Sequence, residues 1–227
     1  MKLSRRLSQI DHMIASNYTH IWDCCCDHGF LGAALLDRNA AQHIHFVDIV
    51  PKLMAALEDK LQQFYSASSS EYYVHCIDVA TIPLSKYKGR HLVVIAGVGG
   101  DLMMDFVSRL NRDHPQLEID FLLCPVHHQY ALRQTLIKNG LRLINESLVE
   151  ENRRYYEVML VTNDSKQGDV ISPVGKQLWQ TNSSEQTELA ANYLDKTLRH
   201  YERIQSGGKS DVAAILKDYR QVSIGDK

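Results

Sequence analysis

Residues 22–32, "WDCCCDHGFLG", place thiols, carboxylates and an imidazole at one turn. Cys24, Cys25 and Cys26 could bind a metal or do redox chemistry, and Asp27 with His28 could move a proton. Zinc sites use ligand pairs two to four residues apart, whereas adjacent strand residues point to opposite faces. The chain also has no C-x-x-C pair, the spacing of thioredoxin-like motifs. We therefore predict no metal, and we interpret the cysteines as small packing residues at the end of a buried strand.

Apolar, β-rich runs and helical spacings alternate along the first 140 residues. Strands are expected at residues 21–24, 43–49, 71–78, 91–97 and 119–125. Helices are expected between them, and residues 52–64 place Leu53, Leu57, Leu61 and Phe64 on one face. This alternation predicts a mostly parallel sheet with helices on both faces.

The pattern changes after Gly140. Residues 141–163 contain two strand-like runs around the polar "EENRR", which predicts an antiparallel hairpin. Five βα units followed by a hairpin are typical of Rossmann-like class I methyltransferases, by analogy of fold. We predict a catalytic domain at residues 1–162 and a helical extension at residues 163–227.

Carboxylates or glycines end four consecutive predicted strands, where a parallel sheet binds its ligands. Asp48 could accept hydrogen bonds from both ribose hydroxyls of a nucleoside cofactor, and Asp78 could accept from an adenine amine. The first strand lacks the G-x-G-x-x-G loop that cradles a pyrophosphate, which favours S-adenosylmethionine over NAD. The cofactor-binding residues that we predict here are Asp23, Cys25, Asp27, Asp48, Ile49, Asp78, Val79, Ala96, Gly97, Val98 and Gly99.

The motifs "WDCCCDHGFLG" and "VVIAGVGG", with the segment from "FLLCPVHHQ" to "YYEVMLV", resemble one known family. They are similar to the bacterial tRNA (adenine-22-N1)-methyltransferases, the TrmK-like group, over most of residues 1–162. The resemblance implies a methyltransferase that converts S-adenosylmethionine to S-adenosylhomocysteine, and a C-terminal extension that helps to hold tRNA. It also places Asp23, Asp27, His28 and Asp48 on the acidic and Asp-His positions of the family.

The sequence departs from the family pattern at three positions. Cys25 stands where the family has a glycine, and Cys124 and Val126 replace Gln and Asn around Pro125. We expect Cys25 to fit as a small substitute for glycine if its φ angle stays negative. The loss of the two amides bears on base recognition and not on the fold.

Methylation of adenine N1 needs alignment more than a strong base, because its lone pair can attack the sulfonium methyl directly. The product ring is cationic, so we predict Asp27 as the stabilising carboxylate and His28 as its neighbour. A contact between Asp27 and the amino group of the cofactor is an equal alternative. His127 and His128, in the loop after the fifth predicted strand, could stack on a target base or be a pair of exposed loop residues without a role.

The extension at residues 163–227 reads as two amphipathic helices joined by "SGGK". It carries nine Lys or Arg and nine Asp or Glu, so binding of tRNA would depend on local rows of charge. A structural or dimerising hairpin is the alternative. The predicted substrate-binding residues are Arg5, Arg6, Gly100, Val126, His127, Lys196, Arg199 and Arg203.

Composition leaves several functions open. The 227 residues have a net charge of −2 and 44% hydrophobic residues, as in ordinary globular proteins. No apolar run is long enough for a membrane span, and five cysteines, an odd number without the spacing of a disulfide framework, fit a cytoplasmic protein. Alternatives to a tRNA methyltransferase are a methyltransferase for a small molecule or another RNA, a dehydrogenase, and a non-catalytic RNA-binding scaffold. Monomer and dimer are both compatible with the sequence.

Overall fold

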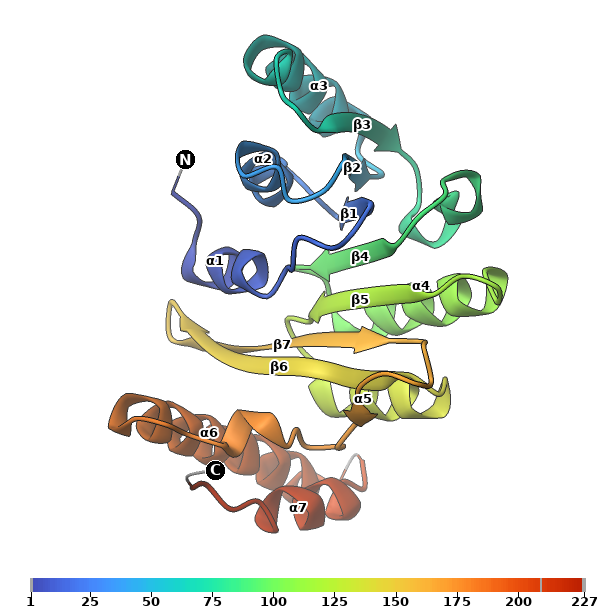
Figure 1. Ribbon diagram of the computed structural model, residues 1–227. Helices are drawn as coiled ribbons and strands as arrows, with labels where there is room; N and C mark the ends of the chain where they lie inside the picture. Colours follow the sequence, from blue (N-terminus) through green and yellow to red (C-terminus); the bar gives the residue numbers. More distant parts are fainter. Residues whose placement is uncertain (1, 209, 226–227) are drawn as a thin grey trace.

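Eight strands form one sheet in the order β3-β2-β1-β4-β5-β7-β6-β8 (Figure 1). The structure is a computed structural model that describes residues 2–208 and 210–225. Strands β1 to β5 are mutually parallel, and β7, β6 and β8 continue the sheet in antiparallel pairs. The strands are β1 (His20–Cys24), β2 (His43–Asp48), β3 (Glu71–Cys76), β4 (His91–Ala96), β5 (Ile119–Cys124), β6 (Arg142–Glu151), β7 (Arg154–Thr162) and β8 (Asp169–Val170).

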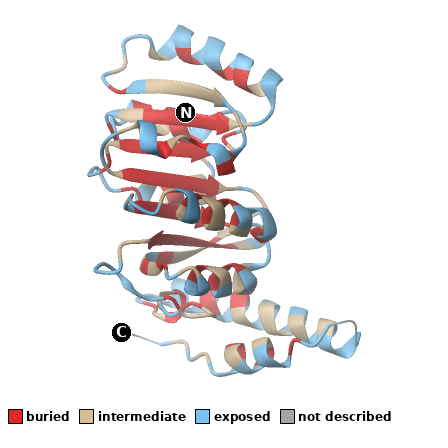
Figure 2. Ribbon diagram, turned by 90° about the vertical axis from the view of Figure 1, so that its right-hand side faces the viewer, coloured by how far each residue is buried: buried red, intermediate tan, exposed pale blue. Residues whose placement is uncertain are grey.

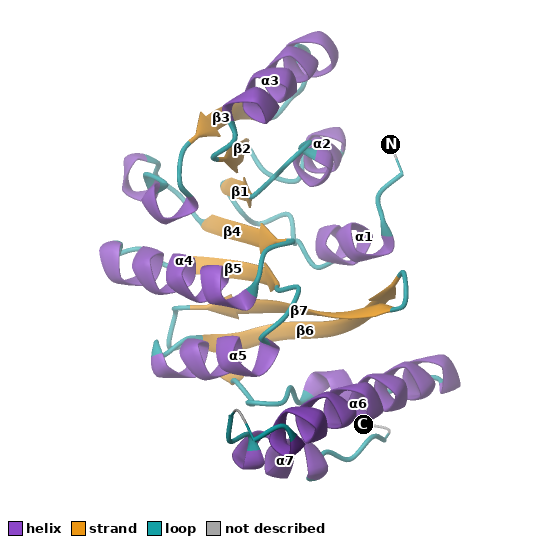
Figure 3. Cartoon of the chain, turned by 180° about the vertical axis from the view of Figure 1, so that it is seen from behind, coloured by secondary structure: helices purple, strands orange, loops and turns teal. Residues whose placement is uncertain are grey.

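Five helices cover the two faces of the sheet, and its central strands are buried (Figures 2 and 3). α1 (Arg5–His12), α2 (Phe30–Asp37) and α3 (Pro51–Tyr65) pack on one face. α4 (Gly100–Asp113) and α5 (Gln129–Lys138) pack on the other. Between β3 and β4 the chain makes only two short turns of 3₁₀ helix, η1 (Val79–Thr81) and η2 (Leu84–Lys86). No helix in residues 2–208 or 210–225 has the length and apolarity of a membrane span.

The extension contributes η3 (Gln177–Trp179), α6 (Ser184–Ser206) and α7 (Ala213–Arg220). Trp179, Tyr193 and Tyr219 form its small core, together with Tyr155 of β7. The predicted fold class, a Rossmann-like sheet that ends in a hairpin and is followed by helices, is confirmed. The boundary between residues 162 and 163 stays a prediction.

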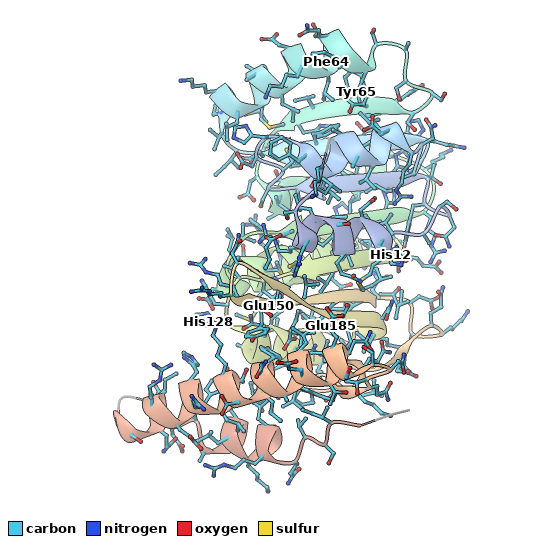
Figure 4. All side chains as sticks on the ribbon, turned by 90° about the vertical axis from the view of Figure 1, so that its left-hand side faces the viewer. His12, Phe64, Tyr65, His128, Glu150 and Glu185 are labelled. Atoms are coloured by element: carbon cyan, nitrogen blue, oxygen red, sulfur yellow. The ribbon has the colours of Figure 1, made fainter. Side chains whose placement is uncertain are left out.

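Two details of the sequence-based expectation were wrong. Phe64 does not share the buried face of α3, because its side chain is 69% exposed (Figure 4). Met54, Leu57 and Leu61 form that face instead, and Tyr65 packs against the core at the end of the helix. Since β3 is the edge strand, the sheet offers the last turn of α3 little more to cover. Helix α1 was not predicted, although its Ile10 is fully buried.

Aromatic rings replace a covering helix on the α4 side of strands β1 to β4. Trp22 stacks on His45 at 3.8 Å between ring centroids, and His20 stacks on His43 at 4.5 Å. We call this group the histidine ladder; its members are His20, Trp22, His43, Tyr73, His45, His75, Tyr87 and His91.

Hydrogen bonds fix the protons of the ladder. His20 Nε2 lies 3.1 Å from the carbonyl oxygen of Lys88, which can only accept, so this nitrogen donates. Burial lowers the pKa of His20, that of His45 to about 2 and that of His91 to about 4, so these rings are neutral. With His20 neutral, its Nδ1 accepts from His45 Nε2 at 3.1 Å, and His45 Nδ1 accepts from His75 Nε2 at 3.0 Å.

The carboxylates of Glu146 and Glu157 share one buried guanidinium, that of Arg133 in α5. Arg133 is fully buried, and its Nη2 lies 2.5 Å from Glu146 and 2.7 Å from Glu157. Its Nη1 donates to the carbonyl oxygen of Ser172, which follows β8, at 3.2 Å. The ion cluster thus joins α5, both strands of the hairpin and the segment after the sheet.

The extension supplies further donors to the same carboxylates. The backbone N–H groups of Lys176 and Gln177 each donate to Glu146 at 2.7 Å. The hydroxyl of Tyr193 in α6 donates to Glu157 at 2.6 Å. Removal of residues 163–227 would strip both buried carboxylates of these partners, so the extension and the sheet stabilise each other.

We predict that acid destabilises the fold through the ladder. Below pH 6.5 the imidazoles of His45 and His91 bind protons in the unfolded chain but not in the folded protein. The free energy of unfolding is therefore highest above about pH 6.5 and falls as the pH is lowered toward 4. His45 alone should cost about 2 kcal/mol at pH 5. Denaturant unfolding at pH 5 and pH 7 measures the loss. His45→Gln should flatten this pH dependence, whereas exposed His12→Gln should keep it; equal slopes in both variants would contradict the prediction.

A second prediction concerns the ion cluster. Arg133→Met leaves two buried carboxylates without their cation and should cost about 3–5 kcal/mol in the free energy of unfolding. Arg199→Met removes a guanidinium from an exposed pair with Asp195 and should cost under about 0.5 kcal/mol. Equal losses in the two variants, measured by chemical denaturation, would rule out a stabilising role for the cluster.

Candidate functional site

The carboxyl ends of the parallel strands bring the predicted carboxylates around Cys25. Burial and, after it, the neighbouring charges of Asp48, Asp23 and Asp78 together raise the pKa of the Cys25 thiol to about 12. The thiol thus stays protonated, which argues against a thiolate nucleophile or metal ligand. Residues 2–208 and 210–225 contain no group of three or more His, Cys, Asp or Glu arranged to hold a metal ion.

Asp48 is half-buried and held at the end of β2 by two backbone donors. Its Oδ2 accepts from the N–H of Asp27 at 3.2 Å, and its Oδ1 accepts from the N–H of Val50 at 3.1 Å. Each oxygen keeps a further lone pair for a ligand. Ile49 beside it is 66% exposed and offers an apolar surface at the same edge.

Asp23 and Asp78 accept hydrogen bonds from backbone N–H groups of the segments that surround the site. Asp23 is buried within β1 and accepts from the N–H of Gly32 in α2 at 2.8 Å, while burial raises its pKa to about 7. Asp78 is exposed and caps η1 by accepting from the N–H of Ala80 at 2.8 Å. Val79 is buried in the core, so only its backbone can reach a ligand. Direct ligand contacts of these residues stay predictions.

Cys25 has a φ angle of +57°, so the negative φ that was set as the condition for its fit is not met. The turn is closed by the N–H of Cys26 on the carbonyl of Val47 and by the N–H of Gly29 on the carbonyl of Cys26. These bonds hold Cys25 in the left-handed region that glycine prefers, at a cost of about 1–2 kcal/mol. The chain has therefore kept the backbone of a glycine turn while it carries a thiol there.

The loops after β4 and β5 are bonded to each other. Gly97 donates to the carbonyl of Cys124, Val126 to that of Val98, and Gly100 to that of His127. A Cβ on Gly99 would lie 2.5 Å from the imidazole of His127, so only glycine lets that ring pack there. Gly100, predicted to bind substrate, meets the His127 backbone in the same way. Ala96 and Val98 are half-buried between these loops and the core.

Gly97 leaves an open space at the mouth. Its φ angle is +83°, and the nearest atoms to a Cβ built there are the two terminal nitrogens of Arg6, at 4.0 Å. Arg6 was expected to contact an RNA phosphate, but α1 places its guanidinium at this glycine. Arg5 points elsewhere, into a groove between α1 and α6 that is also lined by His12, Glu150 and Glu185 (Figure 4).

A groove of about 430 Å³ runs beside the loop after β5, between β7 and α6. It gathers four of the predicted substrate residues, Val126, His127, Lys196 and Arg203. Arg199 lines a neighbouring groove that shares Lys196 and Arg203. The groove also contains His128, which the sequence placed in this loop. Sequence reasoning missed its other aromatic and basic residues, which include Arg154, Tyr155, Tyr156, Tyr193, His200 and Tyr201. The sequence signal for Arg154, Tyr155 and Tyr156 was the segment "RRYYE", in which two aromatic residues follow a basic pair.

Asp27 and His28, the predicted catalytic pair, are exposed at the turn after β1. Asp27 has a φ angle of +50°, and its carboxylate lies 3.7 Å from His28 Nε2. Both side chains are more than half exposed, so both are open to a ligand. Their catalytic roles stay predictions.

We predict that Cys25→Gly keeps or raises the stability of the fold. Glycine removes the left-handed strain of about 1–2 kcal/mol, which offsets the packing of the half-buried thiol. Cys26→Gly is the matched control, because Cys26 is 8% exposed, lies outside the left-handed region and packs in the core. It should lose more than about 1 kcal/mol in thermal or denaturant unfolding. Equal destabilisation of the two variants would contradict the strain at Cys25.

Three comparisons with known proteins agree with this geometry. A family model described as a methyltransferase domain matches residues 3–159. A candidate tRNA methyltransferase of Mycoplasma genitalium is 25% identical over 164 residues, which are 70% of this chain and 69% of that protein.

Solved structures of similar fold cover nearly the whole chain. TrmK of M. capricolum, described in complex with S-adenosylhomocysteine, has a TM-score of 0.75 at 18% identity and covers 97% of both chains. The B. subtilis TrmK, described as a tRNA methyltransferase for adenine 22, has a TM-score of 0.72 at 19% identity and covers 97% of this chain and 98% of its own. The resemblance drawn from the sequence motifs is confirmed. Because the family model spans most of the chain, this protein belongs to the methyltransferase-domain family.

Proposed function

We propose that the protein is an S-adenosylmethionine-dependent tRNA methyltransferase that modifies N1 of an adenine, at position 22 by its resemblance to the TrmK proteins. The observation that carries this proposal is the aromatic and basic groove of about 430 Å³ beside the glycine loop. Its residues Val126 and His127 are hydrogen-bonded to the loop that ends β4, so the groove adjoins the mouth at the strand ends.

The mouth fits a nucleoside sulfonium donor. Asp48 offers oriented acceptors for ribose hydroxyls, Ile49 offers an apolar surface for a flat base, and Gly97 leaves space for a tail. The donor supplies an electrophilic methyl group. The nucleophile needs no proton removed, so the role of the chain is to orient both reactants.

The groove fits a nucleotide. Tyr155 and Tyr201 are half-buried and line the groove, so their rings can stack on a base, at about 1–3 kcal/mol per base. Lys196, Arg154 and Arg203 lie among these rings and can hold phosphates. A small-molecule methyltransferase has no need of such a row of cations on a separate helix.

Base recognition must differ from the family pattern at one point. Val126 stands where the family has an Asn, is 38% exposed and lines the groove. It can pack against a base but cannot form a hydrogen bond with it. The neighbouring His127 imidazole is the nearest polar group on the same loop, and it is exposed. Asp27 remains our candidate for the carboxylate that stabilises the cationic product ring.

Three measurements test the proposal. We expect methyl transfer from S-adenosylmethionine to tRNA, with N1-methyladenosine found by nucleoside mass spectrometry and lost when adenine 22 is changed to guanine. Asp48→Ala should weaken S-adenosylhomocysteine binding roughly 30- to 150-fold, because two charge-assisted acceptors are lost. Lys196→Ala with Arg203→Ala should weaken tRNA binding and lower its salt dependence by about 0.7–0.9 per lost phosphate contact.

Arg112→Gln on α4 is the matched control, since this arginine is exposed and lies outside the grooves. It should leave tRNA affinity unchanged. Cofactor binding without methylation of any tRNA would favour a small-molecule enzyme, and tRNA binding without cofactor binding would favour a non-catalytic scaffold. Point variants are preferable to deletion of residues 163–227, because the buried carboxylates of the sheet depend on that segment.

A further inference from the structure

Arg6 is a cation at the mouth whose guanidinium has no hydrogen-bond or ion-pair partner in residues 2–208 and 210–225. Its Nε is a buried atom without a hydrogen-bond partner within these described ranges. A buried unpaired guanidinium nitrogen is costly. Its position therefore needs an explanation from outside the chain.

The surrounding contacts hold the side chain in place. The backbone N–H of Arg6 donates to Glu151 at 3.1 Å, which ties the first turn of α1 to the hairpin. The guanidinium lies over the ring of Tyr156, with its central carbon 4.9 Å from the ring centroid. The terminal nitrogens of Arg6 face Gly97. Its positive charge opposes the rise that burial causes in the pKa of the Cys124 thiol at the end of β5. Arg6 is thus oriented toward the ends of β4 and β5 before any ligand arrives.

The charges at the strand ends are divided between two sides. Asp48, Asp78 and Asp27 lie at the ends of β2, β3 and β1, where hydroxyls, amines and a sulfonium would find acceptors. Arg6 lies on the other side, at the ends of β4 and β5. A ligand that is cationic in its middle and anionic at one end would match this division.

The spacing also matches such a ligand. Asp48 ends β2 and Gly97 follows β4, with β1 between them in the sheet. Two strand spacings amount to about 10 Å. A methionine tail that leaves a ribose held by Asp48 can cross β1 and bring its carboxylate to Gly97.

We propose that Arg6 binds the methionine carboxylate of S-adenosylmethionine and of its product, S-adenosylhomocysteine. This assignment rests on the proposed function and replaces the expected contact with an RNA phosphate. The planar guanidinium can bind a carboxylate through two parallel hydrogen bonds. The glycine at position 97 keeps the space between the two groups free of a side chain.

Calorimetry with two ligands tests the assignment. 5′-Methylthioadenosine shares the adenosine and sulfur of S-adenosylhomocysteine but lacks the carboxylate. Arg6→Met should weaken S-adenosylhomocysteine about 10- to 100-fold. The affinity for 5′-methylthioadenosine should change by less than about 2-fold, because that ligand has no carboxylate to bind the guanidinium. Arg6→Lys keeps the charge and should lose less, while Arg5→Met, a neighbouring exposed arginine, should alter neither affinity.

Other outcomes separate the explanations. Equal weakening of both ligands in Arg6→Met would show a structural role and overturn the assignment. Unchanged S-adenosylhomocysteine affinity together with weaker tRNA binding would return Arg6 to a phosphate contact and overturn it as well. If the unaltered protein bound neither ligand, the proposed function itself would fail. Should Arg6→Met not fold, Arg6→Lys must show the same preference between the two ligands for the assignment to stand.

Discussion

The buried guanidinium of Arg133 fixes the positions of β7 and α6, the two elements on either side of the 430 Å³ groove. It binds a carboxylate from each strand of the hairpin, and the extension supplies the remaining donors to both. Helix α6 is therefore anchored at Tyr193, and the residues that follow it along the helix, Lys196 to Arg203, face the loop after β5. One buried cation with two carboxylates leaves a net negative charge in the interior, which only these additional donors make tolerable. The same buried interactions therefore both position the groove and stabilise the sheet.

A second constraint is the backbone geometry of the loops at the carboxyl ends of the parallel strands. Cys25, Asp27 and His128 all adopt left-handed φ angles, each in a loop that follows a strand. Such angles cost energy in residues other than glycine, and they persist where hydrogen bonds leave the chain no alternative. At Cys25 the bonds between the β1 and β2 loops provide that enforcement. The turn after β1 thus has the backbone shape of a glycine turn although a cysteine occupies it.

Sequence reasoning located the strands because alternating and apolar runs are local signals. It located the strand-end carboxylates because topology alone brings parallel strand ends together. It could not give the direction of Arg6, since the three lysine and arginine residues near the N-terminus look alike until α1 is packed against the hairpin. It also could not give the Arg133 cluster, whose members come from four elements far apart in the chain. At Phe64 the helical period was right, but the width of the sheet decided burial.

The histidine ladder has a consequence for how the strands align. His20 is level with His43 in the sheet, yet its nitrogen meets His45, two residues further along β2, and His45 in turn meets His75 on the far side of Tyr73. The imidazoles are thus joined along a diagonal that exists in one alignment of β1, β2 and β3. A slip of one residue would turn every ring of the displaced strand to the opposite face and leave ring nitrogens in the core without partners. Strands made only of Val and Ile would tolerate such a slip far more easily, so the ladder selects a single pairing of β1, β2 and β3 as the sheet assembles.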